Sequence, residues 1–120
     1  MTTQGHRAER VAEEIRNEVS LMLAGELKDP RLTADVTITE VRLAPGMRTI
    51  RIFVQVAGTD EERAKTLEGL QAAKGFVRHE LVERLHMRRA PEVLFLLDQT
   101  EEIEKRINEL LHKPGSPEKP

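Results

Sequence analysis

Residues 72–81 read AAKGFVRHEL and lie inside a long stretch of helix-forming sequence, with Gly75 near its centre. A glycine in a helix interior costs roughly 1 kcal/mol relative to alanine, because it loses more backbone freedom. The stretch opens with Thr59 and Glu62 in the spacing of a capping box and contains no proline before Pro91. The sequence therefore predicts one long helical segment, in which the cost of Gly75 must have a structural or functional reason.

The apolar residues of this segment recur on one helix face: Leu67, Leu70, Val77, Leu81 and Leu85. On a straight helix Lys74 would fall in that stripe, while Phe76 would point away from the core. Burying a lysine and exposing a phenylalanine reverses the usual distribution. We therefore predict a bend at Gly75 that lets the two halves pack with different rotational phases. In the alternative, Lys74 and Arg78 lie along the core edge with their charged ends in water, and Gly75 marks a close helix contact.

The segments before this helix have simpler patterns. Residues 7–27 place an apolar side chain at every fourth position, which is typical of an amphipathic helix. Alternating apolar residues predict strands over residues 36–43 and 50–56, joined by a turn at residues 44–46, which read Ala-Pro-Gly. The alternation changes register near Glu40, which indicates a β-bulge.

The end of the chain completes the order of elements. The apolar run at residues 93–97 predicts a third strand, and Asp98 precedes a last amphipathic helix. We predict one domain over residues 1–112 and a disordered tail over residues 113–120. The order helix, strand, strand, bent helix, strand, helix predicts an α+β fold with helices on one face of a three-stranded mixed sheet.

The composition argues against several classes of protein. The chain has no cysteine, so it has no disulfide framework and no thiolate metal site. It shows no apolar signal core and no apolar run long enough for a membrane span, so we expect a cytoplasmic protein without a membrane partner. Ser20 and Ser116 lie outside any nucleophile motif, and His79 and His86 are seven residues apart, which is wrong for paired zinc ligands. We expect no enzyme activity, cofactor, metal or small-molecule substrate.

Charge is unevenly distributed although the net charge is only -2. Residues 42–58 contain three arginines and no acid, and residues 74–89 contain five basic residues against two acidic ones. Residues 90–112 contain two basic residues against six acidic ones. A localised basic face matters more for phosphate binding than the total charge. Ordinary solvated surface charge is the alternative explanation.

Four motifs stand in order along the chain: RVAEEI at 10–15, DPRL at 29–32, AKGFVR at 73–78 and RRAPEVLF at 88–95. Together they resemble the ribosome-binding factor A family of bacterial small-subunit assembly factors, over about residues 7–111. The resemblance implies a type II KH-like RNA-binding fold in which an interhelical kink at Ala73, Lys74 and Gly75 replaces the usual Gly-x-x-Gly loop. That loop motif is absent from the sequence.

The resemblance also implies a function. Family members bind the free 30S subunit, contact 16S rRNA, assist late maturation of 16S rRNA and often support growth in the cold. We expect the same partners here, and a monomer. Ala44, Gly46 and Glu104 depart from residues common in the family, so contacts made by those positions are not carried over.

The candidate RNA contacts follow from the predicted bend. Free backbone N–H groups and a half-helix dipole at the bend would attract a phosphate, and Lys74 and Arg78 would add two cations one turn apart. Arg88 and Arg89 would extend the basic track, whereas acids near Arg31 and Arg7 make these weaker candidates. The predicted RNA-binding residues are Ala73, Lys74, Gly75, Arg78, Arg88, Arg89, Arg31 and Arg7. With three aromatic residues in the chain, all Phe, stacking on several bases is not expected.

A protein-interaction module without direct RNA contact is the alternative function. In that case the outer face of the strand at 50–56, with Phe53 between Arg51 and Gln55, would dock a partner protein. The acidic last helix would steer the encounter. A steep salt dependence of RNA binding would separate the two functions.

Overall fold

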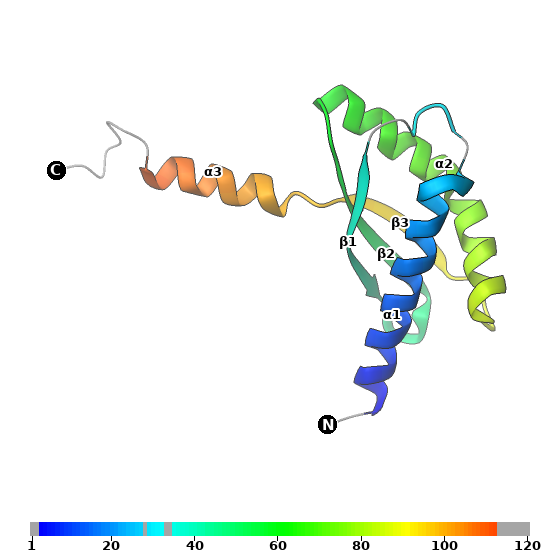
Figure 1. The fold of residues 1–120 in the computed structure, drawn as a ribbon. Helices are drawn as coiled ribbons and strands as arrows, with labels where there is room; N and C mark the ends of the chain where they lie inside the picture. The colour runs from blue at the N-terminus through cyan, green and yellow to red at the C-terminus, as the bar shows by residue number, and fades with distance from the viewer. Residues whose placement is uncertain (1–2, 28, 33–34, 113–120) are drawn as a thin grey trace.

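The computed structural model describes residues 3–27, 29–32 and 35–112. The predicted tail at 113–120 lies outside these residues. Figure 1 shows the elements: α1 (Thr3–Leu21), the π-helical turn η1 (Met22–Glu26), β1 (Val36–Leu43), the 3-10 turn η2 (Pro45–Met47), β2 (Thr49–Val56), α2 (Asp60–Leu85), β3 (Glu92–Leu97) and α3 (Thr100–His112). This order confirms the predicted α+β fold.

The sheet has the strand order β1-β2-β3, with β1 and β2 antiparallel and β2 and β3 parallel. The predicted β-bulge is confirmed, because the β1–β2 register shifts between Ile38 and Glu40. The turn between β1 and β2 is also confirmed, with Gly46 at a φ of 72°. A positive φ is accessible to glycine at no steric cost, which lets the chain reverse there.

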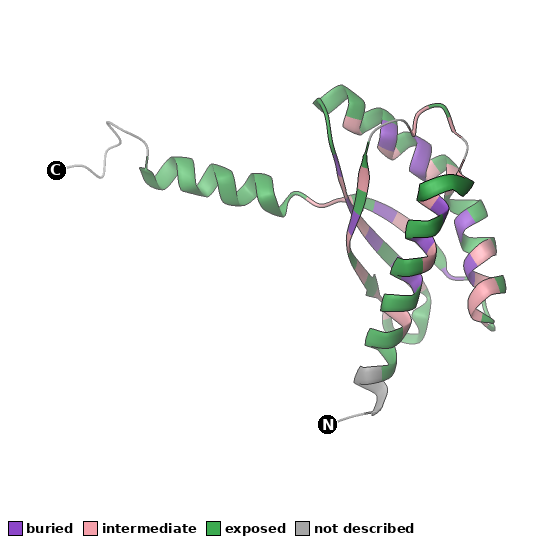
Figure 2. Cartoon of the chain, in the orientation of Figure 1, coloured by how far each residue is buried: buried purple, intermediate pink, exposed green. Residues whose placement is uncertain are grey.

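The core lies between one face of the sheet and the helices α1 and α2. Figure 2 shows buried residues on the strands and on the helix sides that face them. Alternate residues of β2 point into this layer, whereas Arg51, Phe53 and Gln55 between them face the open side. The buried apolar side chains are Ile15, Val19, Met22, Ile38, Ile50, Ile52, Val54, Val56, Leu70, Val77, Leu81, Val93 and Phe95.

The helix α3 does not join this layer. It projects away from the sheet and all its residues are exposed (Figures 1 and 2). Asp98 fixes the point of departure, since its carboxylate accepts hydrogen bonds from the Thr39 hydroxyl (2.5 Å) and from the Thr100 N–H (2.9 Å). Two of the three helices therefore cover the sheet. None of the described helices combines the length and the apolar run that crossing a membrane requires.

The helix α2 is bent but not divided. It begins with the predicted capping box, in which the Thr59 hydroxyl accepts from the Glu62 N–H (3.1 Å) and the Glu62 carboxylate accepts from the Thr59 N–H (2.7 Å). Helical structure then continues without interruption to Leu85. Figure 1 shows that the first part of α2 runs obliquely and the second part turns to descend beside the sheet.

The buried residues of α2 keep one rotational phase. Thr66, Leu70, Val77 and Leu81 are all buried at spacings of four, seven and four residues, which is a single helix stripe. Our expectation of two different phases is therefore wrong, and Phe76 remains 42% exposed on the other side of the helix. Lys74 is exposed at the edge of the stripe, so its ammonium stays in water.

Two glycines of α2 have opposite surroundings. A Cβ added at Gly75 would meet nothing within 4 Å, so Gly75 does not mark a close packing contact. A Cβ at Gly69 would lie 3.1 Å from a Leu32 methyl carbon and 3.2 Å from the Arg31 Cβ. Gly69 therefore lets the loop at residues 29–32 lie directly against α2, which is the role that we had considered for Gly75.

These surroundings predict different effects of adding one methyl group. Gly75→Ala should raise the free energy of unfolding by roughly 0.5–1 kcal/mol, because alanine loses less backbone entropy in a helix and its methyl group finds open space. Gly69→Ala should give no such gain, because its methyl group presses on Leu32. Urea denaturation of both variants measures the difference, and equal stabilisation would contradict the assigned packing.

Candidate nucleic-acid interface

The predicted RNA-binding residues lie in three places. One group lines a hollow of about 400 Å³ between α2 and the edge strand β3, which we call the α2–β3 hollow: Gln71, Ala72, Lys74, Gly75, Arg78, Glu92 and Val93. A second group lines a groove of about 800 Å³ at the far end of α2, which we call the end groove: Arg7, Val11, Glu14, Gly46, Met47, Leu85, His86, Met87, Arg88 and Arg89. Arg31 stands apart in the loop before β1.

The α2–β3 hollow presents two free cations beside bare helix backbone. Lys74 and Arg78 are exposed, and within the described residues neither forms an ion pair. Gly75 leaves the helix surface between them uncovered, whereas Ala73 is half-buried. Glu92 is the one carboxylate of the lining. The hollow is therefore weakly cationic, and a ligand can approach the helix backbone closely at Gly75.

Gln71 adds a polar group to this hollow. Its side-chain N–H donates to the Phe95 carbonyl of β3 (3.0 Å). Its carbonyl oxygen is buried and finds no donor among the described residues. A buried acceptor of this kind is costly unless a ligand or water supplies the missing hydrogen bond.

The predicted free N–H groups are not present around Gly75. Because α2 remains helical through residues 73–78, the backbone amides there are engaged in the helix. Free amides require a helix terminus, and the bend creates none. Any anion at this hollow must therefore be held by the side chains of Lys74 and Arg78.

The end groove brings together arginines that are far apart in the sequence. Arg7 comes from α1, and Arg88 and Arg89 come from the connection between α2 and β3. All three are exposed, and among the described residues none is paired with a carboxylate. Glu14 is the one carboxylate of the groove. The predicted basic track is thus divided between two separate places, the α2–β3 hollow and the end groove.

Two residues of the end groove have left-handed backbone. Met47 has a φ of 55°, and His86 has a φ of 54° at the C-terminus of α2, where its N–H donates to the Val82 carbonyl. Glycine is the usual residue at such a helix end, and a positive φ is uncommon for other residues. In the sequence His86 stands out only by its distance of seven residues from His79, and no spacing signals its conformation.

Arg31 is already engaged by carboxylates. Its Nε and Nη2 donate to the two carboxylate oxygens of Asp29 (2.9 and 2.7 Å), and its Nη1 lies 3.4 Å from Glu68. The hydrogen bonds from Arg31 lower the pKa of Asp29 to about 2, and Asp29 in turn raises the pKa of Arg31. To make the predicted RNA contact, Arg31 would have to break its ion pair with Asp29 and bind a phosphate instead.

Arg84 is also used within the fold. Its guanidinium contacts Glu80 on its own helix, Glu18 (3.0 Å) and Glu26, and these hydrogen bonds raise the pKa of Arg84. The contact joins α1 and η1 to α2. One of the five basic residues of the segment 74–89 therefore serves packing rather than ligand binding.

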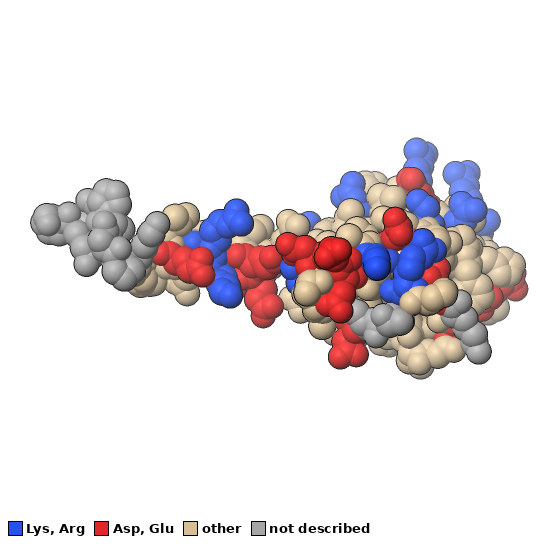
Figure 3. Space-filling view, turned by 90° about the horizontal axis from the view of Figure 1, so that it is seen from above, with Lys and Arg blue, Asp and Glu red and all other residues tan. Residues whose placement is uncertain are grey.

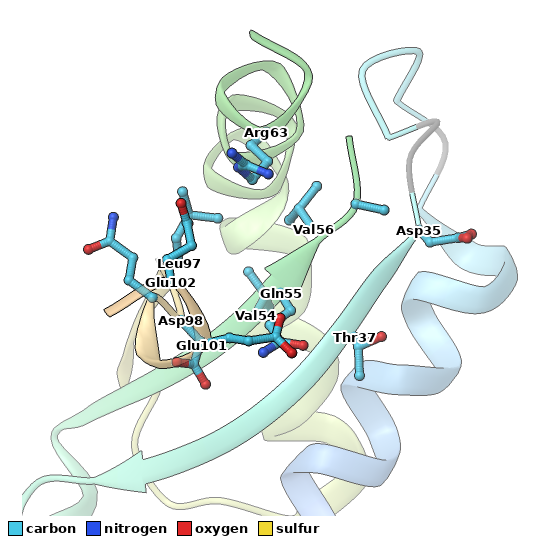
Figure 4. A pocket seen from close by; sticks show the side chains of 12 residues that line it. Asp35, Thr37, Val54, Gln55, Val56, Arg63, Leu97, Asp98, Glu101 and Glu102 are labelled. Atoms are coloured by element: carbon cyan, nitrogen blue, oxygen red, sulfur yellow. The ribbon is translucent and has the colours of Figure 1, made fainter. Parts of the chain in front are cut away.

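The opposite end of the sheet is acidic. A hollow of about 260 Å³ lies where α3 begins, and its lining includes Asp35, Asp98, Glu101, Glu102 and Arg63. Figure 4 shows Asp98, Glu101 and Glu102 close together there, whereas the side chain of Asp35 points away from them. The Thr39 hydroxyl lowers the pKa of Asp98, which keeps this carboxylate ionised. Figure 3 shows acidic side chains along α3 as well. In the part of the chain that the structure describes, no group of His, Asp and Glu is arranged to hold a metal ion.

The open sheet face is the surface of the alternative function. Phe53 is half-buried there, with the Arg42 guanidinium 5.7 Å from the centre of its ring. Arg42 is itself paired with Glu40 (2.6 Å). The aromatic side chain is therefore partly covered by its own neighbours, in a cation–π arrangement.

A three-stranded mixed sheet with two helices on one face, in this element order, defines a KH-like α+β domain. The sequence profile described as "Ribosome-binding factor A" matches residues 7–111. The chain belongs to the ribosome-binding factor A family, a family of non-enzymatic ribosome assembly factors.

Individual relatives agree with this assignment. Ribosome-binding factor A of Koribacter versatilis is 48% identical over 90% of this chain and 87% of its own, and that of Caldanaerobacter subterraneus is 39% identical over 92% and 91%. The crystal structure of ribosome-binding factor A from Thermus thermophilus superposes with a TM-score of 0.58 at 25% identity, covering 80% of this chain and 97% of that one. Coordinates of a Thermus thermophilus ribosome binding factor A fitted into a cryo-EM map of its 30S complex give a TM-score of 0.52 at 27% identity, covering 71% and 92%.

The Asp29–Arg31 pair predicts an acid-shifted titration. Asp29 should titrate near pH 2 in the wild-type protein, and Arg31→Ala should return its midpoint toward the ordinary value of 3.8. Since the folded pKa is lowered, the pair stabilises the fold above the unfolded pKa and loses this effect as the pH falls toward 2. Carboxyl-detected NMR measures both midpoints, and a wild-type midpoint near 3.8 would show that Arg31 is free.

Proposed function

We propose that this protein binds the free 30S subunit through 16S rRNA and assists late maturation of that rRNA, with the α2–β3 hollow as its principal contact. Membership of the ribosome-binding factor A family supports the partner, since the Thermus thermophilus relative is described in a 30S complex. The observation that supports the contact surface is the pair of unpaired, exposed cations on either side of Gly75. The role requires a cytoplasmic, non-enzymatic protein, and a monomer is sufficient for it.

The hollow suits an RNA backbone rather than particular bases. Lys74 and Arg78 would neutralise phosphates, and contacts of this kind position a nucleic acid without reading its sequence. The missing side chain at Gly75 would let a sugar or phosphate approach the helix closely.

The distribution of charge would orient the protein on the subunit. The acidic α3 and the acidic hollow at its base would be repelled by phosphates, whereas the opposite end carries the free arginines. Complementary charge of this kind guides association and suppresses wrong orientations. A bound factor that fits only one conformation of the rRNA would favour that conformation during late maturation. Such help would matter most in the cold, where the rRNA crosses the energy barriers between conformations more slowly.

The first test reverses both cations of the hollow. Lys74→Glu combined with Arg78→Glu should abolish cosedimentation with free 30S subunits and leave the circular dichroism spectrum unchanged, because both side chains are exposed. If the variant retains measurable affinity for a 16S fragment, its salt slope should fall by roughly 1.4 to 1.8, the contribution of two phosphate contacts.

The matched control is Lys105→Glu combined with Arg106→Glu, which makes the same charge change on α3. This control should cosediment like the wild type. Normal cosedimentation of the Lys74 and Arg78 double variant would contradict the proposed contact. It would favour the protein-interaction function, in which a partner protein docks on the open sheet face around Phe53.

Gly75 provides a second test of the same surface. Gly75→Ala should weaken binding to 30S subunits because its methyl group fills the space that a phosphate or sugar would occupy. The same variant should fold more stably, so lost binding cannot be explained by lost structure. Unchanged affinity in a filter-binding assay would show that no RNA atom approaches this position closely.

A further inference from the structure

The end groove has a shape and chemistry distinct from the α2–β3 hollow. Its volume of about 800 Å³ lies in the range of small-ligand sites. Three arginines, Arg7, Arg88 and Arg89, line it, and Glu14 is the one acidic residue of the lining. This excess of positive charge fits an anionic ligand.

The groove also has an apolar part. Val11, Leu85 and Met87 are half-buried in its lining, and the side chains of Met47 and His86 are exposed beside them. An apolar surface next to three cations fits a ligand that joins a flat, weakly polar group to a phosphate. A nucleotide has this composition, and proteins commonly hold unstacked bases on histidine rings or arginine planes.

The backbone around the groove supports a binding role. Met47 and His86 belong to separate connections, yet both have left-handed backbone and both line this groove. Strained conformations of non-glycine residues tend to occur where a side chain is held for a ligand. At the end of α2 a glycine would satisfy the backbone, but it would remove the imidazole from the groove.

We propose that the end groove binds one unstacked nucleotide of a single-stranded rRNA segment. The base lies on the His86 ring and the apolar lining, and its phosphate is held by Arg7, Arg88 and Arg89. The proposal rests on the proposed function, namely RNA binding by this protein, and deepens it by naming the form of RNA that this end of the molecule takes. A base within a duplex is stacked and paired and cannot enter the groove.

NMR titration of the full-length, ¹⁵N-labelled protein with two probes tests this proposal. The probes are AMP and ribose 5-phosphate, which carry the same phosphate but differ in the base. AMP should shift the amides of residues 46–48 and 86–89. Ribose 5-phosphate should bind roughly tenfold more weakly at the same residues, because it lacks the stacking contribution of the base.

Two matched pairs of variants assign the contacts. His86→Asn keeps a residue that tolerates left-handed backbone but removes the ring, so AMP should then bind no better than ribose 5-phosphate. His79→Asn, on the exposed surface of α2, should leave AMP binding unchanged. Arg7→Ala should weaken the binding of both probes. Arg10 is not part of the groove lining, so Arg10→Ala should weaken the binding of neither.

Three outcomes would overturn the proposal. Equal affinity for AMP and ribose 5-phosphate would make the groove a simple anion site. Shifts confined to other residues, or identical behaviour of His86→Asn and His79→Asn, would remove the base from the groove. Cosedimentation of the wild type with 30S subunits, measured in parallel, tests the proposed function separately. The protein can cosediment although the end groove does not bind AMP, and it can fail to cosediment although the groove binds AMP.

Discussion

The structure depends on one-sided burial of a three-stranded sheet. Within the described residues only one face of β1, β2 and β3 is covered, and both α1 and α2 must fit on it. Phe95 and Ile52 lie in adjacent strands at the centre of that layer, and the buried stripe of α2 packs over it. Because Leu70, Val77 and Leu81 must all face the sheet, the residues beside that stripe are forced to its edge. Lys74 and Arg78 reach solvent next to β3 for this reason.

The same constraint sorts the charged residues into two roles. Arg31 and Arg84 lie where separate segments meet, and each is surrounded by carboxylates that raise its pKa. Lys74, Arg78, Arg88 and Arg89 lie where no other segment of the described chain covers them. Free cations, rather than the number of basic residues, define where phosphates can bind, and a protein with a net charge of -2 can therefore still present surfaces suited to phosphates.

The two proposed binding surfaces, along one segment of α2, suggest how a small protein can engage an irregular RNA. The α2–β3 hollow suits a backbone of defined shape, and the end groove suits a base that has left its stack. Glu92 lines the hollow and lies three residues after Arg89, so the two surfaces are close in the chain. A protein without Tyr or Trp would thus rely on charge, shape and a single histidine ring rather than on a broad aromatic platform.

The sequence alone determined the element order, the capping box at Thr59, the β-bulge near Glu40 and the turn at Gly46, because each depends on interactions between residues that are near in the chain. The joint order of four motifs also determined the family. Tertiary structure decided the rest. The clustering of Arg7 with Arg88 and Arg89, the engagement of Arg31 and the close contact at Gly69 involve segments far apart in sequence. The continuous backbone of α2 through residues 73–78 and the left-handed conformation of His86 at its end were also not signalled by any local pattern.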